Sequence, residues 1–143
     1  MQHQINLLSL SLAIGSIYLA GIAISHYWPR LRGRHPGTFL VEEWLMLGVT
    51  ISFTAFGVNS LYWWFAFFFQ AIGATDAMQL FFSNGQLANI VTRHIPYSAA
   101  AMCHLFGFWK FLHDKTHRHP LWHFAVAAGL SAAMWIILQL VAG

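Results

Sequence analysis

The sequence predicts an all-α fold, a polytopic membrane protein built as a bundle of four transmembrane helices with short loops. Of the 143 residues, 58% are hydrophobic and only 8% are charged, whereas a soluble domain has about 25% charged residues. The charged residues lie between four long apolar segments, and six of the seven Lys and Arg residues lie in or next to two of the connections. A disordered chain is excluded, because disorder needs low hydrophobicity and high charge. We therefore expect one transmembrane domain, residues 1–143.

The first span is predicted over residues 5–28. These 24 residues carry no charged side chain other than His26, and at 1.5 Å per residue a helix of this length crosses a hydrocarbon core of about 30 Å. A secretory signal peptide has its positive charge ahead of the apolar segment, but here Arg30 and its neighbours follow it. We therefore expect a retained helix that ends at Pro29, with its N-terminus outside the cytoplasm.

The second span is predicted over residues 44–70, after a polar loop rich in Gly and Pro. Between Glu43 and Asp76 the chain has 32 residues without charge, although a straight crossing needs only about 20. The aromatic block 62–69 is expected to reach the far interface, where Trp and Tyr are enriched. A tilted or kinked helix follows, with Gly57 as a possible bend.

The third and fourth spans are predicted over residues 90–112 and 121–142. In the third, Arg93 and Lys110 lie 17 positions apart, about 25 Å of helix, so we expect both to extend to opposite interfaces. The fourth has no Lys, Arg, Asp or Glu. The connection 76–92 reads as a polar loop with a turn at Asn84-Gly85.

Four crossings place most of the basic residues on one side of the membrane. The positive-inside bias makes this side cytoplasmic, so we expect a multi-pass protein of the bacterial inner membrane with both termini outside the cytoplasm. The charges therefore report topology, and no nucleic-acid partner is expected. The inner-side residues are Arg30, Arg32, Arg34, Lys110, Lys115 and Arg118.

Small residues at helical spacing are expected to bring the helices together, because lipid gives no hydrophobic drive for helix association. The same stripes fit packing within one chain and self-association into an oligomer. Asn59, an amide within the second span, should find a hydrogen-bond partner. The stripes contain Gly21 and Ser25, then Gly48 and Ser52, then Ala100, His104 and Gly107.

Nine histidines are the feature most suited to chemistry, and seven fall on the inner side of this topology. The pairs His113/His117 and His119/His123 each have i, i+4 spacing, and neutral imidazole binds Zn, Cu, Fe and Ni. A divalent metal site on these four is one hypothesis. Haem ligation by two histidines, with His26 and His104 as candidates, is another. Against both stands the ordinary use of histidine in a membrane interface, which requires no cofactor.

The string 119–123 (HPLWH) resembles the paired-histidine motif of alkaline ceramidase-type membrane hydrolases, and the run from His113 resembles the histidine boxes of membrane desaturases and hydroxylases. Ceramidase-like enzymes have seven spans, and desaturases have more histidine boxes than this chain. No activity is therefore transferred from either family.

The sequence contains no nucleotide-binding loop, nucleophile elbow or pair of carboxylates at hydrolase spacing, so an enzyme is the less favoured class. The expected role is helix association in the bilayer, within a homo-oligomer or a larger membrane complex. Two uses fit, a holin-like oligomer that permeabilises the membrane and an accessory subunit of a membrane complex. The alternative is a haem- or metal-binding redox or metalloenzyme subunit that uses the inner-side histidines.

Overall fold

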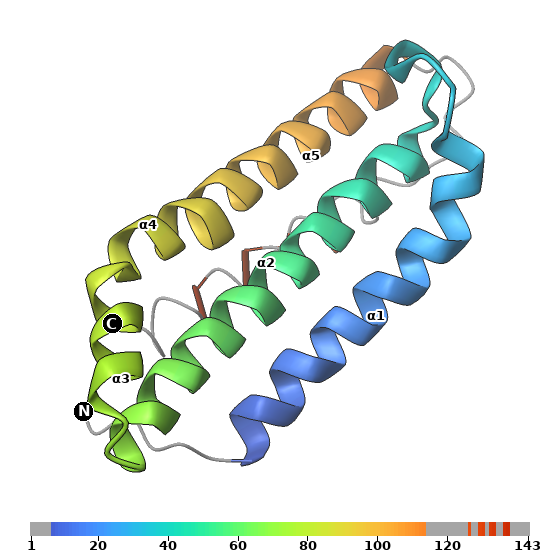
Figure 1. Ribbon diagram of the computed structural model, residues 1–143. Coiled ribbons are helices and arrows are strands. Elements are labelled where there is room, and N and C mark those ends of the chain that lie inside the picture. The colour runs from blue at the N-terminus through green and yellow to red at the C-terminus, as the bar shows by residue number, and fades with distance from the viewer. Residues whose placement is uncertain (1–6, 114–125, 127–128, 131, 134–135, 138–143) are drawn as a thin grey trace.

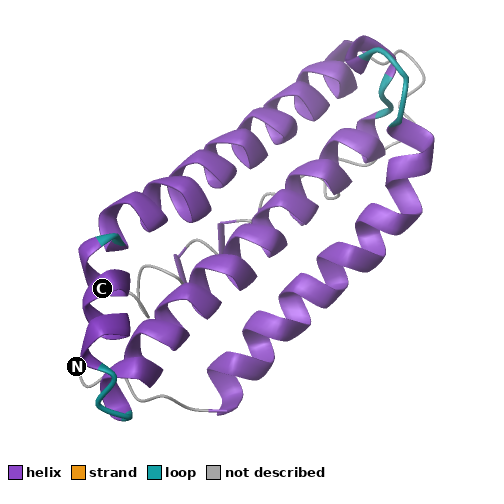
Figure 2. Cartoon of the chain, in the orientation of Figure 1, coloured by secondary structure: helices purple, strands orange, loops and turns teal. Residues whose placement is uncertain are grey.

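The computed structural model describes residues 7–113 together with residues 126, 129–130, 132–133 and 136–137. This part of the chain is helical and contains no strand, as Figure 2 shows, so the all-α prediction is confirmed for it. The helices are α1 (Leu7–Leu31), α2 (Val41–Ala71), α3 (Thr75–Ser83), α4 (Gly85–Asn89) and α5 (Ile95–His113), with a 3₁₀ turn η1 (Pro36–Thr38) and a π-helical turn η2 (Ile90–His94).

Helix α2 lies at the centre of the described part. Helices α1 and α5 pack on it from two sides (Figure 1) and do not contact each other within the described residues. Two of these helices, α1 with 25 residues and α2 with 31, are long and apolar enough to cross a membrane. The predicted third span corresponds to η2 followed by α5.

The first helix does not stop at Pro29 as predicted but continues to Leu31. Proline removes one backbone donor, and within the last turn of a helix this loss affects a single hydrogen bond. Arg32 N still donates to the Trp28 carbonyl at 2.8 Å, and Leu31 is buried. Both features keep the last turn helical.

Helix α1 packs on α2 through a face other than the predicted one. Gly21 and Ser25 are exposed, and the buried positions before the last turn are Ala13, Ser16 and Ala20. Helix α2 continues without interruption through Gly57. A Cβ at Gly57 would lie 2.4 Å from Ile17 Cγ1 and 2.8 Å from the Ala13 carbonyl oxygen, so this glycine permits close approach of α1.

The connection predicted as a polar loop over 76–92 is mostly helical. Asn84 separates α3 from α4, and its Nδ2 donates to the Leu80 carbonyl at 2.8 Å. Tyr62 Oη donates to the Phe81 carbonyl at 2.6 Å, and the Phe82 ring contacts the rings of Trp63 and Phe67. The aromatic block of α2 therefore holds α3 in place, a long-range contact that local polarity does not reveal.

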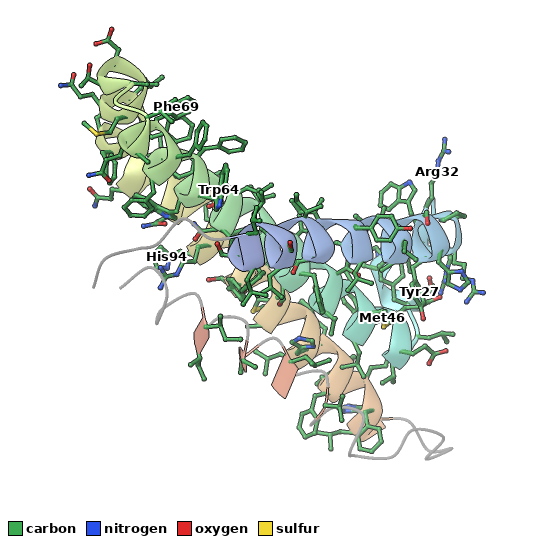
Figure 3. The ribbon with its side chains drawn as sticks, turned by 90° about the horizontal axis from the view of Figure 1, so that it is seen from below. Tyr27, Arg32, Met46, Trp64, Phe69 and His94 are labelled. Carbon is green, nitrogen blue, oxygen red and sulfur yellow. The ribbon has the colours of Figure 1, made fainter. Side chains whose placement is uncertain are left out.

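The basic residues of the described part lie at both ends of the bundle, while Lys115 and Arg118 lie outside the described residues. The end of α1, the start of α2 and the end of α5 meet at one end, while α3, α4 and η2 lie at the other (Figure 1). Figure 3 shows Arg32 and His94 at opposite ends of the described part. Arg30, Arg34 and Lys110 lie at the Arg32 end.

Candidate functional site

The seam between α2 and α5 is a close antiparallel contact made through small residues. A Cβ at Gly48 of α2 would lie 2.7 Å from His104 Cε1, and a Cβ at Gly107 of α5 would lie 3.2 Å from Trp44 Cβ. Ala100 is buried on the same side of α5. The small-residue stripes predicted on these two segments therefore face each other, and in this part of the chain they serve packing within one molecule.

A network of polar side chains joins the far end of this seam to α4 and η2. Asn59 is fully buried, and its Nδ2 donates to Asn89 Oδ1 at 3.0 Å and to Thr92 Oγ1 at 2.9 Å. Trp63 Nε1 donates to the same Asn89 oxygen at 2.9 Å, and Thr92 Oγ1 donates to the Ala88 carbonyl at 2.6 Å. The partner predicted for Asn59 is confirmed.

Arg93 lies directly beside this network and is enclosed. The sequence predicts that its side chain extends to the interface, but only 6% of the residue is exposed, so that expectation is wrong. The π-helical turn η2 departs from the 3.6-residue spacing that the expectation assumed, and such turns are frequent at functional sites.

Several polar atoms near Arg93 are buried without a hydrogen-bond partner among the described residues. They are Arg93 Nε, Tyr97 Oη and Asn59 Oδ1. The guanidinium is close enough to Tyr97 to act on its hydroxyl electrostatically. Buried polar groups are nearly always paired. We therefore take Arg93, Tyr97 and the Asn59 network as the candidate site.

The opposite end of the bundle is a structural junction. Glu43 is 5% exposed; its Oε1 accepts from Arg34 Nη1 at 2.8 Å and its Oε2 accepts from Leu40 N at 2.7 Å. Lys110 Nζ donates to the carbonyls of Gly37 and Phe39. Lys110 is thus bonded to loop carbonyls instead of extending freely to the interface. Glu43 and Lys110 together hold the loop between α1 and α2 against α2 and α5.

The two histidines proposed as a haem pair lie on helices that do not contact each other. His26 is exposed on α1, with its ring edge-on to Tyr27 at 5.2 Å between centroids. His104 packs over Gly48 on the other flank of α2. The described part of the chain therefore does not bring this pair together.

Of the four histidines proposed for a metal, only His113 lies in the described part. It is exposed at the end of α5, with Nδ1 2.8 Å from the Trp109 carbonyl oxygen. His117, His119 and His123 lie outside the described residues. Among the described residues, no three His, Cys, Asp or Glu side chains are grouped closely enough to hold a metal ion.

Sequence reasoning singled out Asn59 but missed its partners. The available signal was the spacing of Asn89 and Thr92, three residues apart in a segment read as a loop. On a helix this spacing places both on one face, opposite an amide that needed a partner.

Comparison of the chain with protein-family models, curated proteins and solved structures found no match. The chemistry of the site therefore comes from its own side chains. An enclosed cation beside a tyrosine hydroxyl can bind an anionic oxygen group, and the Asn59 network holds η2 against α2 so that this arrangement is rigid.

Proposed function

We propose that this protein is an integral membrane protein that acts through helix association as an accessory subunit of a larger membrane complex. The observation that carries the proposal is the uncovered apolar surface of α1. Of its most apolar 18 residues, only 11% are buried. Soluble monomers rarely expose apolar patches above a few hundred Å². The uncovered side chains include Leu8, Leu12, Ile14, Leu19, Ile22 and Ile24.

The other flank of the bundle has the same character. Large apolar side chains of α5 are 45–62% exposed, although α5 packs on α2 along one face. Because α1 and α5 lie on different flanks, an apolar surrounding is needed on both. A bilayer supplies it, and helices of a partner can replace part of the lipid. The exposed α5 residues include Met102, Leu105, Phe106, Trp109 and Leu112.

The placement of polar side chains favours a subunit over a membrane-permeabilising oligomer. An aqueous pore built from several copies needs polar groups on an outward face. Ser52, Asn59 and Arg93 are buried. The exposed hydroxyls of Ser11 and Ser25 donate to carbonyls of their own helix. These polar groups thus point inward or bond to their own backbone.

The test uses the full chain in its native membrane. We expect alkaline carbonate to leave it in the membrane fraction, mild detergent to release it in a particle that contains a second polypeptide in fixed ratio, and induced expression to leave the membrane potential unchanged. Recovery in the aqueous fraction would overturn the membrane placement. A pure homo-oligomer whose expression collapses the potential would replace the accessory role with the holin-like one.

Orientation has its own test. We propose that the Arg32 end of the bundle faces the cytoplasm of a bacterial inner membrane, since Arg30, Arg34 and Lys110 lie there too. Reporter fusions at both termini should read outside the cytoplasm. Cytoplasmic activity of either fusion would contradict this orientation.

A metal or haem role at the inner-side histidines is the second candidate. The observation that favours it is His113, whose Nδ1 lies 2.8 Å from the Trp109 carbonyl. In metal sites this contact orients the imidazole so that Nε2 is the ligand. An absorption spectrum and metal analysis of the purified chain test it. A Soret band indicates haem, stoichiometric Zn or Fe indicates a metal site, and a colourless, metal-free protein removes both.

A further inference from the structure

The chain places few acidic groups that can neutralise Arg93. Its sequence has four acidic residues. Glu42 and Glu43 begin α2 at the opposite end of the bundle, and Asp114 lies outside the described residues. Asp76 is exposed in the first turn of α3. Within the described part, the salt bridge formed joins Arg34 and Glu43, and Arg93 has none.

Arg93 is only 6% exposed, and the described part of the chain gives it no anionic partner. Arginine cannot discharge by losing its proton, unlike lysine or histidine. Enclosing an unpaired charge is costly, and the cost is offset when an oppositely charged group completes its hydrogen bonds. The Nε–H of Arg93 has no partner in the described part. An external anion could supply what the carboxylates of the described part do not.

The neighbouring donors define the chemistry of that anion. Tyr97 lies four residues beyond Arg93, and its buried hydroxyl also has no hydrogen-bond partner in the described part. Guanidinium N–H groups and a phenol O–H together present several donors, and arginine's planar fork matches phosphate oxygens. On the opposing helix α2, the Phe56 side chain packs against Tyr97, and Asn59 follows three residues later.

The position of Arg93 along the bundle agrees with a phosphate ligand. Arg93 lies 17 residues before Lys110, about 25 Å along a helix, and a hydrocarbon core is about 30 Å thick. Trp63, which typically lies at the membrane interface, bonds to Asn89 at the same level. If the membrane placement proposed above holds, Arg93 lies within reach of the lipid phosphates on that side.

We propose that Arg93, together with Tyr97, binds one phosphate group at the α4–η2 end of the bundle. The group is carried by an anionic phospholipid headgroup or is free inorganic phosphate. The lipid source rests on the proposed membrane placement, whereas the phosphate site itself does not.

The experiment measures binding to the full chain purified in a neutral detergent. Phosphatidylglycerol, a neutral galactolipid without phosphate, and inorganic phosphate are titrated separately, with lipid retention by native mass spectrometry and thermal unfolding as readouts. We expect phosphatidylglycerol or inorganic phosphate to bind and stabilise, and the galactolipid to do neither. Arg93→Gln should weaken that binding about tenfold, the effect of losing a hydrogen bond to a charged group.

Arg32→Gln is the matched control. It removes the same charge from an exposed position at the opposite end and should leave phosphate binding unchanged. Equal losses in the two variants would indicate attraction by net charge and overturn the site. Absence of phosphate binding to the unchanged chain would overturn it as well.

Two further comparisons keep the outcomes separable. If Arg93→Gln does not fold, Tyr97→Phe removes only the hydroxyl and should weaken binding several-fold; full binding by a folded Tyr97→Phe would exclude Tyr97 from the site. Stabilisation by phosphatidylglycerol alone assigns the lipid, and stabilisation by inorganic phosphate at matched ionic strength assigns the free ion. Recovery of the chain from the aqueous fraction would remove the membrane role and the lipid source, while phosphate binding would still be measured.

Discussion

Gly57 provides the sharpest test of how α1 and α2 meet. In Gly57→Ala the new Cβ would lie 2.4 Å from Ile17 Cγ1 and 2.8 Å from the Ala13 carbonyl oxygen, whereas non-bonded carbons prefer about 3.5–4.0 Å. The Ile17 side chain can rotate away, but the carbonyl belongs to the backbone of α1, so the whole helix must shift. Overpacking of this kind costs about 1–3 kcal/mol.

The matched control is Gly21→Ala on α1, where a Cβ meets nothing within 4 Å. Replacing glycine by alanine inside a helix is favourable by about 1 kcal/mol in both variants, so this gain cancels in the comparison. The difference between the two free energies of unfolding then reports the close approach alone. We expect Gly57→Ala to be less stable than Gly21→Ala by about 1–3 kcal/mol.

The measurement is reversible unfolding of the purified chain in mild detergent, titrated with sodium dodecyl sulfate and followed by circular dichroism and tryptophan fluorescence. A loss confined to Gly57→Ala supports the α1–α2 contact. Equal stability of Gly57→Ala and Gly21→Ala would show that α1 does not approach α2 at Gly57, and the arrangement of the two helices would have to be revised.

Three further predictions use the same preparation. Asn59→Ala removes two hydrogen bonds and should destabilise the chain by about 1–2 kcal/mol while shifting the emission of Trp63; unchanged stability and emission would contradict the network. Arg34→Gln should lower the free energy of unfolding by about 1–2 kcal/mol, because it leaves the enclosed Glu43 without its charged partner. Arg32→Gln, at an exposed position, should be near neutral. Equal effects of the two variants would contradict a structural role for the junction. Changing both His119 and His123 to Ala should leave membrane insertion unaffected and abolish any bound metal, and unchanged metal content would exclude this pair as ligands.

The existence of the long helices could be predicted from the sequence, but their ends could not. Uninterrupted apolar segments indicate helices because a backbone in lipid must satisfy its own hydrogen bonds. The end of α1 was misplaced because Pro29 costs little in a last turn. The connection 76–92 was read as a loop because its residues are polar on average, yet Phe81 and Phe82 dock onto an aromatic block that is distant in sequence.

The choice of packing faces shows the same limit. On α5 the stripe with Ala100 and Gly107 was predicted correctly, and both residues are buried. On α1, small residues occur on more than one face: the predicted face holds Gly21 and Ser25, whereas Ala13 and Ser16 are buried. Gly57 on α2 selects the face, because its missing side chain lets α1 approach closely at Ala13 and Ile17. This partner residue cannot be identified from the sequence of α1 alone.

Lys110 and Arg93, the two cations of the third predicted span, have different hydrogen-bond acceptors available at the two ends of the α2–α5 seam. Lys110 lies beside a loop whose backbone turns back at η1 and offers the carbonyls of Gly37 and Phe39, so it finds acceptors within the chain. Arg93 lies within the π-helical turn η2, between α4 and α5, where the described chain has no such loop, and its Nε has no hydrogen-bond partner in the described part. The two cations thus differ in the backbone around them. The proposed phosphate would supply at the Arg93 end the acceptor that the loop supplies to Lys110.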